Sequence, residues 1–400
     1  MELNEKTEIE ESIPEGYWKS KIGIIPNDWR CIKIGEILKI KHGKSQKKVE
    51  VPNGKYPILA SGGIIGWTDE FLCNKPSVLI GRKGTIDKPK YFNTPFWTVD
   101  TLFYSEFKID CCEKFFYYVF DSINWYRYNE ASGVPSLSAR TIESIFVQLP
   151  SKEEQIRIVK ILSTQDKIIH MLEQLIEKKV NVKKYLMQVL LNYHSEYFKQ
   201  LDGFSGEWRN VLLNKVVENK VRKVNKPLNG YWRLGLRSHG KGTFHEFITN
   251  PETNAMDILY EVKENDLIAN ITFAWEHAIT IANKRDENKL VSHRFPTYEF
   301  INDNVPEFFK FFILRDKFKK QLQDISPGGA GRNRVMSKKD FLKLNVTIPD
   351  PEEQLEIARI LSAIDEEIKL LNDEFEQQIK KKKSLMQLLL TGKVRTTNMS

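Results

Sequence analysis

The sequence has only four cysteines and seven histidines, and neither set is spaced as a metal site. Cys31, Cys73, Cys111 and Cys112 form no CxxC motif and are too sparse for a disulfide scaffold. The histidines show no HxxxH or HExxH spacing, which zinc hydrolases use to place two ligands on one helix face. We therefore expect reduced thiols and no metal bound by this chain.

Long hydrophobic runs are absent as well. No stretch approaches the roughly 18 to 20 apolar residues that cross a bilayer. The N-terminal residues MELNEKTEIEES are acidic, whereas a signal peptide begins with basic and then apolar residues. These features predict a cytoplasmic protein with no membrane partner. Because 400 residues exceed one ordinary core, two or more domains are expected.

Catalytic motifs are missing too. The chain has no glycine-rich cofactor turn with an NPPY-like or DPPY-like loop, as a methyltransferase needs, and no GxxxxGK[ST] loop. One short string, Asp257, Glu261 and Lys263, has the D-x3-ExK spacing of a metal-dependent nuclease. Such strings are frequent in a chain with 28% charged residues. We therefore expect no catalysis by this chain and no cofactor bound to it, with an autonomous metal-dependent DNA endonuclease as the alternative.

What the sequence does have is positive charge in two blocks. Residues 29–148 carry 17 basic and 12 acidic side chains, and residues 208–347 carry 24 and 16, within a net charge of +8. Neutralisation of phosphates by Lys and Arg releases counterions and supplies most non-specific affinity for nucleic acid. Two basic blocks between nearly neutral segments therefore favour binding to a polyanion, with a solvated basic surface as the alternative.

An internal repeat separates and follows these blocks. Residues 149–191 align without a gap to residues 348–390, with 19 identities over 43 positions. Each copy opens with proline and two glutamates and then runs for about 40 residues without Gly or Pro. Proline loses no hydrogen bond in the first turn, and carboxylates there meet the positive end of the helix dipole. Each copy is therefore predicted to be one helix of roughly 60 Å.

Both predicted helices carry an apolar seam with three-four spacing, which is typical of a coiled coil. The seam positions are Leu162, Gln165, Ile169, Leu172, Ile176, Lys179, Lys183, Leu186 and Leu190 in the first copy, and Leu361, Ile364, Ile368, Leu371, Phe375, Gln378, Lys382, Leu385 and Leu389 in the second. An antiparallel pairing is expected to set Lys380–Lys383 near Glu173 and Glu177. The alternative is that each helix packs only on its own domain, but the equal length of the copies argues against it.

The segments between the helices read as short strands broken by Gly, Asn and Pro turns. Both begin near an acidic-Trp-Arg triplet, at Asp28 and Glu207, and end at Leu137-Ser138 or Met336-Ser337, while their interiors share almost nothing. The predicted fold class is α+β: two mixed α/β domains separated by two long antiparallel coiled-coil helices, with an internal pseudo-two-fold repeat. The predicted divisions are a tail (1–20), the first domain (21–148), a spacer helix (149–196), the second domain (200–347) and a second spacer helix (348–395).

Several strings together carry a family resemblance. They are KSKIGIIPNDW at 19–29, SGGIIGWTDEF at 61–71, VLIGRKGTID at 78–87, the two PxxEEQ helix starts and SLMQLLLTGKVR at 384–395. With these features the sequence resembles the specificity (S) subunit of type I restriction-modification systems. The resemblance covers nearly the whole chain beyond about residue 17, and the combination is more specific than any one string.

This resemblance implies a non-catalytic, DNA-binding subunit of a multisubunit complex. Each target-recognition domain would read one half of a bipartite, asymmetric site in double-stranded DNA, and the helices would set the unread gap. The partners implied are two adenine-N6 methyltransferase (modification) subunits and the motor-nuclease (restriction) subunits. S-adenosylmethionine, ATP and Mg²⁺ are expected in those partners.

Residues that read DNA need cationic, amide or hydroxyl groups on loops that can approach the duplex. In the first domain we select Arg82 and Lys83, which lie between glycines, a lysine cluster and the serine of the SGG turn. The DNA-binding candidates are Lys41, Lys44, Lys47, Lys48, Ser61, Arg82 and Lys83 in the first domain, and Arg237, Ser238, His239, Lys241, Arg332, Asn333 and Arg334 in the second. For each of them the alternative is a solvated surface residue.

A third function, from another class, is a coiled-coil scaffold that assembles proteins without reading DNA. It predicts that replacement of residues 208–347 by another such domain leaves the modified DNA site unchanged. If the chain is instead a subunit that reads DNA, the same replacement is expected to change only one half of the site.

Overall fold

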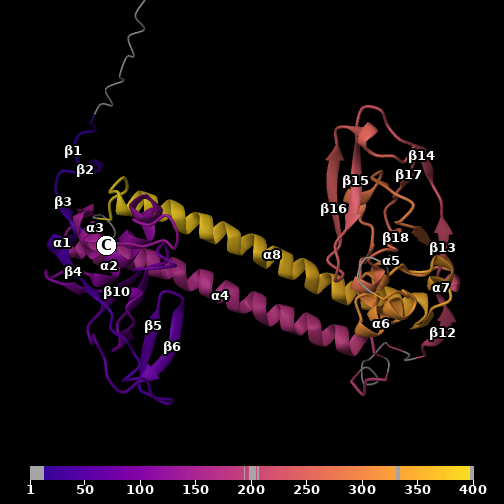
Figure 1. Ribbon diagram of the computed structural model, residues 1–400, viewed down its shortest axis with the longest axis horizontal. Coiled ribbons are helices and arrows are strands. Elements are labelled where there is room, and N and C mark those ends of the chain that lie inside the picture. The colour runs from indigo at the N-terminus through magenta and orange to yellow at the C-terminus, as the bar shows by residue number, and fades with distance from the viewer. Residues whose placement is uncertain (1–12, 193, 198–203, 205–206, 330–333, 397–400) are drawn as a thin grey trace, which may run out of the picture. The chain divides into compact units, whose positions relative to one another are not determined.

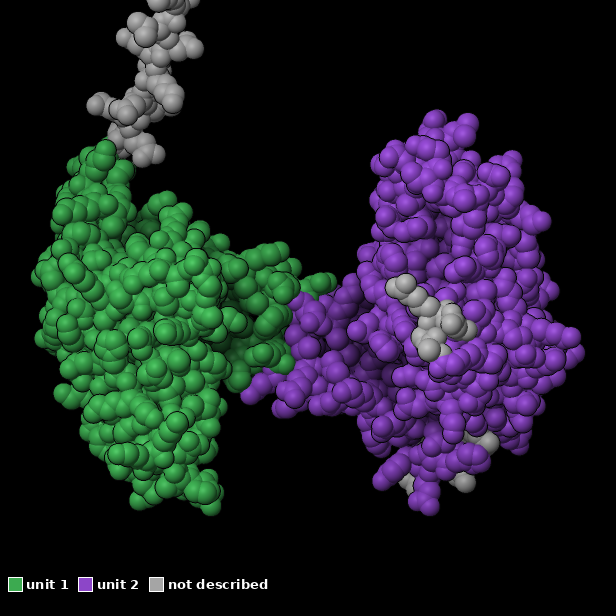
Figure 2. Space-filling view, in the orientation of Figure 1, with its two compact units in different colours: residues 1–173, 373–400 green, residues 174–372 purple. Residues whose placement is uncertain are grey.

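A computed structural model describes residues 13–192, 194–197, 204, 207–329 and 334–396. The chain divides into two compact units, coloured separately in Figure 2. Unit 1 comprises residues 1–173 and 373–400, and unit 2 comprises residues 174–372. Helix α4 (Lys152–Leu190) begins in unit 1 and ends in unit 2, whereas α8 (Pro351–Leu390) begins in unit 2 and ends in unit 1. Each unit therefore contains part of both long helices.

A four-stranded antiparallel sheet lies at the centre of each unit, and the strand order is the same in both. In unit 1 the order is β4 (Leu38–His42), β10 (Leu102–Phe107), β7 (Ser77–Gly81) and β8 (Lys90–Phe92). In unit 2 it is β13 (Val217–Lys220), β21 (Thr297–Phe300), β18 (Leu267–Ala269) and β19 (Ile279–Ile281). The duplication of the helices thus extends into interiors whose sequences have diverged.

The two units differ in a second sheet, most of whose strands lie between the first and second of these strands along the chain, with one further strand just before the last of them. Unit 1 has a three-stranded sheet of β6 (Gly63–Thr68), β5 (Tyr56–Ala60) and β9 (Trp97–Thr98). Unit 2 has a five-stranded sheet of β14 (Lys223–Asn225), β17 (Ile258–Glu261), β20 (Leu290–Val291), β15 (Tyr231–Leu236) and β16 (Thr243–Ile248). Its long β15–β16 hairpin is visible in Figure 1.

Short helices pack on each central sheet and complete its core. In unit 1 these are α1 (Ile34–Ile37), α2 (Glu113–Ser122) and α3 (Ala139–Ser144). In unit 2 they are α5 (Pro306–Phe312), α6 (Asp316–Asp324) and α7 (Lys338–Phe341). Helices α2 and α5 each bury a cluster of aromatic side chains, among them Phe115, Phe116, Phe308 and Phe309. Burial of these rings removes large apolar areas of the units from water.

Two-stranded sheets mark the framework at the edge of each unit. In unit 1, β1 (Tyr17–Ser20) pairs with β2 (Gly23–Pro26), and β3 (Arg30–Lys33) pairs with β11 (Phe146–Leu149). In unit 2, β12 (Arg209–Leu212) pairs with β22 (Asn345–Ile348). The strand after each acidic-Trp-Arg triplet is therefore joined to the strand before each PxxEEQ segment.

The PxxEEQ segment connects α4 to unit 1 through buried hydrogen bonds. The Trp29 indole donates to Glu154 (Nε1–Oε2 2.9 Å), and the Gln155 amide donates to the Pro150 carbonyl (3.0 Å). The Gln155 oxygen accepts from the backbone N–H of Cys112 (2.9 Å), the residue that precedes α2. The motif thus anchors the start of the long helix to both the edge strands and α2.

Unit 2 repeats this joint at the start of α8. The Trp208 indole donates to Glu353 (Nε1–Oε1 2.7 Å), and Gln354 donates to the Pro349 carbonyl (3.0 Å). The Gln354 oxygen accepts from the backbone N–H of Val305 (2.9 Å), which precedes α5. The acidic-Trp-Arg triplet and the EEQ string are therefore partners in both units.

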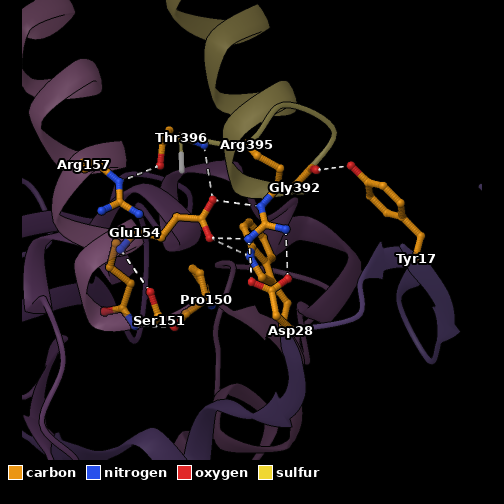
Figure 3. A network of polar contacts seen from close by, with 11 residues as sticks. Tyr17, Asp28, Pro150, Ser151, Glu154, Arg157, Gly392, Arg395 and Thr396 are labelled. Atoms are coloured by element: carbon orange, nitrogen blue, oxygen red, sulfur yellow. Dashed lines mark hydrogen bonds and ion pairs between the residues drawn. The ribbon is translucent and has the colours of Figure 1, made fainter. Parts of the chain in front are cut away.

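The C-terminal segment after α8 makes hydrogen bonds with residues near the start of unit 1 and with α4 (Figure 3). Its Arg395 guanidinium donates to both Asp28 oxygens (2.9 and 2.6 Å) and both Glu154 oxygens (3.0 and 2.9 Å). The Tyr17 hydroxyl donates to the Gly392 carbonyl (3.0 Å). The LTGKVR string at the end of the repeat therefore binds to residues from β1, from the DWR triplet and from α4.

The predicted seam is confirmed, because all 18 of its positions are buried or half-buried. In unit 1 the Gln165 amide donates to Gln378 (Nε2–Oε1 2.6 Å), so a polar seam position of one helix meets one of the other. In unit 2, Lys179 pairs with Glu367 (2.6 Å) and Lys183 with Asp365 (2.5 Å), as antiparallel helices require.

The expected position of the lysine run was wrong. Lys382 pairs with Asp166 (2.8 Å) and with Asp121 of α2 (3.7 Å), rather than with Glu173 or Glu177. Burial raises the pKa of Asp121, although Lys382 opposes the effect. The antiparallel register places Lys382 about two turns closer to the start of α4 than expected. This register also makes Lys382–Asp166 the repeat equivalent of Lys183–Asp365.

The structure confirms an α+β fold with two mixed domains and two long antiparallel helices. In the part of the chain that it describes, no helix is long and apolar enough to span a bilayer.

Candidate nucleic-acid interface

In unit 1, the strands of the central sheet bring several predicted DNA-binding residues to one edge. Strand β4 ends at His42 and β7 ends at Gly81, and both pair with the start of β10 at Phe103 and Leu102. In an antiparallel sheet the end of one strand lies beside the start of the next. The loops that follow β4 and β7 therefore emerge together.

Backbone contacts tie these loops to the segment before β10. The N–H of Lys44 donates to the Thr98 carbonyl, and the N–H of Arg82 donates to the Thr101 carbonyl, both at 2.8 Å. The Arg82 guanidinium donates to the Asp100 carbonyl (3.2 Å) and remains half-buried, whereas Lys44 and the adjacent Lys83 are exposed. The cationic side chains are thus carried on loops with defined backbone positions.

The β5–β6 turn reaches the same edge. A Cβ added to Gly84 would lie 3.6 Å from the Ser61 hydroxyl, and one added to Gly63 would lie 3.9 Å from the Lys90 ammonium. We call Lys44, Ser61, Arg82, Lys83 and Lys90 the basic edge of unit 1. Hydroxyls, ammonium groups and guanidinium groups on close loops can contact phosphates and base edges.

Glycines make the Arg82–Lys83 loop possible. Gly84 has a φ of +86°, a conformation that L side chains rarely adopt. A Cβ on Gly81 would lie 2.0 Å from the Thr85 carbonyl oxygen, a distance no real side chain tolerates. The GRKG string therefore encodes a tight turn that presents two cations.

The other lysines predicted for unit 1 lie apart from this loop. Lys41 is within β4 and pairs with Glu106 at 3.2 Å. Lys47 and Lys48 are exposed on the turn between β4 and β5. Their DNA contacts stay a prediction, and exposed lysines at such positions suit the phosphate backbone better than base edges.

In unit 2, the tip of the β15–β16 hairpin docks on the short helix η5 (Ala274–Glu276), which follows β18. The Ser238 hydroxyl donates to the Glu276 carboxylate (2.5 Å), and the N–H of His239 donates to the Glu276 carbonyl (2.8 Å). The φ of His239 is +63°, as a tight tip requires. Lys241 is exposed on this tip, and Arg237 stacks on Phe244 at 5.4 Å.

The second predicted cluster of unit 2 meets the same short helix. The Arg334 guanidinium lies 5.2 Å from the centre of the Trp275 ring and donates to the carbonyls of Ser326 (3.1 Å) and Gln323 (3.3 Å). These contacts engage Arg334 within unit 2. Arg332 and Asn333 lie outside the described residues.

Hence the β15–β16 tip and Arg334 both contact η5, after β18, and the predicted loops of unit 1 meet after β7. The sequence did not point to two further neighbours of this edge of unit 1, Lys90 and the loop at 133–136, whose Pro135 carbonyl accepts from the N–H of Gly84 (2.9 Å). The internal repeat could have pointed to the 133–136 loop, because its 199-residue offset aligns Gly133 and Val134 with the candidates Arg332 and Asn333.

The D-x3-ExK string of unit 2 does not assemble a metal site. Asp257 and Glu261 lie four residues apart on the extended β17 segment, so their Cα atoms are roughly 13 Å apart. The Asp257 side chain is 95% exposed and Glu261 pairs with Lys263 at 3.4 Å. Among the described residues, no group of three or more His, Cys, Asp or Glu side chains could hold a metal ion.

Comparison with known proteins agrees with this architecture. The profile of the type I restriction modification DNA specificity domain matches residues 26–181 and 230–381. The type I restriction enzyme MjaVIII specificity subunit of Methanocaldococcus jannaschii is 26% identical over 411 residues, which cover 94% of this chain and 95% of that protein. The putative MjaX specificity subunit of the same organism is 27% identical over 269 residues, covering 65% and 62%.

A solved structure shares the fold. The type I restriction-modification system S subunit from M. genitalium superposes with a TM-score of 0.61 at 16% identity, covering 90% of this chain and 96% of that one. The two profile matches span most of the sequence and one falls on each basic block. The chain therefore belongs to the type I restriction modification DNA specificity domain family and carries two such domains, as a specificity subunit of a type I restriction-modification system does.

Proposed function

We propose that this chain reads a bipartite, asymmetric site in double-stranded DNA, with one half-site for each unit. The observation that carries the proposal is that predicted basic residues lie at equivalent strand ends, on the Arg82–Lys83 loop after β7 in unit 1 and around η5, after β18, in unit 2. The sheets inserted beside them differ in strand number. Equivalent frameworks with different loops suit two half-sites of different sequence.

The paired helices are proposed to set the length of the gap that is not read. A seam of apolar and paired polar positions holds one register between α4 and α8. Half-sites separated by a helical turn of DNA lie about 34 to 36 Å apart, which is shorter than a helix of 39 residues at 1.5 Å per residue. The helices are therefore long enough to act as a spacer.

The chain is proposed to direct chemistry that its partners perform in the cytoplasm. Two modification subunits would methylate adenine in each half-site with S-adenosylmethionine, and motor-nuclease subunits would cleave unmodified DNA with ATP and Mg²⁺. The absence of methyltransferase and P-loop motifs from the sequence supports this division of labour.

The first experiment maps adenine methylation in cells that express this chain with the modification subunits of its own system. Arg82→Ala with Lys83→Ala should relax or abolish recognition of one half-site, whereas Lys241→Ala should affect only the other. Lys19→Ala, which removes an exposed lysine from β1, is the matched control and should leave the site unchanged. Methylation that does not depend on this chain would refute the proposal.

A second experiment distinguishes a reading subunit from a scaffold. Residues 208–347 are replaced by the corresponding domain of another specificity subunit, and methylated sites are mapped again. A reading subunit changes one half of the site and keeps the other. A scaffold that does not read DNA leaves both halves as they were.

A further inference from the structure

The β5–β6 ribbon of unit 1 exposes large apolar side chains at and near its tip. Ile64 is 56% exposed, Ile65 is 48% exposed and Trp67 is 42% exposed. Single exposed apolar residues are common on protein surfaces, but several on one short ribbon mark a surface that another molecule covers. In Figure 1 the ribbon projects from unit 1 on the side away from β1 and β2.

A bulge in the ribbon turns both isoleucines outward. Ile58 is opposite Gly66, but the next residue, Leu59, is opposite Ile64. Ile65 is therefore an extra residue in β6, and such a bulge breaks the alternation that would otherwise bury one neighbour. The bulge therefore leaves two adjacent branched side chains, Ile64 and Ile65, exposed to solvent.

Cationic and polar groups lie beside the turn of this ribbon, and the Glu50 carboxylate lies beside Gly66 further along β6. The turn residue Ser61 lies beside Gly84 of the Arg82–Lys83 loop, and Gly63 lies beside the Lys90 ammonium. The neighbouring 133–136 loop adds Val134, which is 66% exposed. An apolar tip beside cationic loops is complementary to a surface with apolar groups between rows of phosphates.

We propose that the β5–β6 ribbon enters the major groove and that Ile64 and Ile65 recognise thymine through its 5-methyl group. The major groove is wide enough for a two-stranded ribbon, and the thymine methyl is the apolar group among the base edges exposed there. The inference rests on the proposed function, in which adenine is the methylated base, so each half-site contains at least one thymine. The cations of the basic edge then lie toward the phosphates.

The test uses the complex of this chain with its modification subunits and duplexes that carry the mapped site. Each thymine of the half-site read by unit 1 is replaced in turn by deoxyuridine, which lacks only the methyl group. At least one replacement should weaken binding by the wild-type complex about three- to fivefold, as loss of a buried methyl group predicts. The Ile64→Ala, Ile65→Ala double variant should bind the thymine duplex more weakly and should not respond to that replacement.

Several outcomes overturn the inference. They are a wild-type complex insensitive to every deoxyuridine, a double variant that keeps the full deoxyuridine response, and a double variant that fails to bind the modification subunits, which would make the tip a protein-docking surface. Ile258→Ala, at an exposed isoleucine of unit 2, should retain the response. If the wild-type complex does not prefer the mapped site to a scrambled duplex, the proposed function itself fails.

Discussion

At the scale of single residues, Arg395 is the clearest case of a side chain whose role comes from distant partners. Its guanidinium joins Asp28, which is exposed, to Glu154, whose side chain is 1% exposed. Hydrogen bonds from Arg395 lower the pKa of Asp28. Burial alone would raise the pKa of Glu154, but hydrogen bonds from Arg395 and Trp29 outweigh it and leave this pKa below its ordinary value.

Removal of this cation should destabilise unit 1. Arg395→Ala leaves the Glu154 carboxylate buried without its ion pair, and loss of one partner of a buried pair costs about 3 kcal/mol. Arg395→Lys keeps the charge but not the fork of donors, so its loss should be smaller. Urea unfolding followed by a probe in unit 1 measures both. Equal stability of the wild type and Arg395→Ala would contradict the role assigned here.

The same network predicts a pH dependence of stability. The folded-state pKa values of Asp28 and Glu154 lie below their ordinary values of 3.8 and 4.5. Their contribution is therefore present above the unfolded-state values and is lost as the pH falls through the lower folded-state values. Between pH 6 and pH 3 the wild type should lose more stability than Arg395→Ala does. Parallel losses in urea titrations at these two pH values would contradict the prediction.

At the scale of elements, the EEQ string connects a long helix to a short one. Gln155 and Gln354 are 2% and 0% exposed, and each satisfies a proline carbonyl and the N–H before a short helix. Buried backbone groups left unpaired cost free energy, so the amide is required rather than any polar residue. The repeat of these contacts explains why the string occurs twice.

Each glutamine should therefore stabilise its own unit. Gln155→Ala is expected to cost about 1 to 3 kcal/mol and to loosen α2, and Gln354→Ala to do the same to α5. Hydrogen exchange measured by mass spectrometry resolves the two helices. Gln387→Ala, at an exposed position of α8, is the matched control. A change that spreads equally over both units would contradict the assignment.

At the scale of the whole molecule, the two units share the order of their central sheets but differ in their second sheets. The central sheets keep the same order because buried strands tolerate exchange of one apolar residue for another. The loop tips are exposed and bear no such constraint. Two domains can thus diverge in what they read while they remain attached to one pair of helices.

The spacer role predicts a defined change in the DNA gap. Lys179 pairs with Glu367, so the register places Lys369 opposite Glu177. Insertion of one heptad after each of these two residues preserves the seam and adds about 10 Å, or roughly three base pairs of B-DNA. Methylation mapping should find both half-sites unchanged and the gap longer. Insertions of three residues, which break the seam, are the control, and an unchanged gap would contradict the spacer role.

The sequence alone determined the long helices, their antiparallel pairing and the presence of two strand-rich domains. These features depend on periodic apolar positions, helix-start residues and a gap-free repeat, all of which act over short stretches of chain. The family resemblance followed from the same strings.

Only the tertiary structure decided which residues share a site. Arg395 meets Glu154 across 241 positions, the Ser61 turn reaches Gly84, and Ser238 and Arg334 both contact η5. The lysine run was misplaced because the seam pattern repeats every turn or two and does not select one register by itself. Strand order, register and a single bulge set these distances, since they depend on packing between segments that the sequence separates.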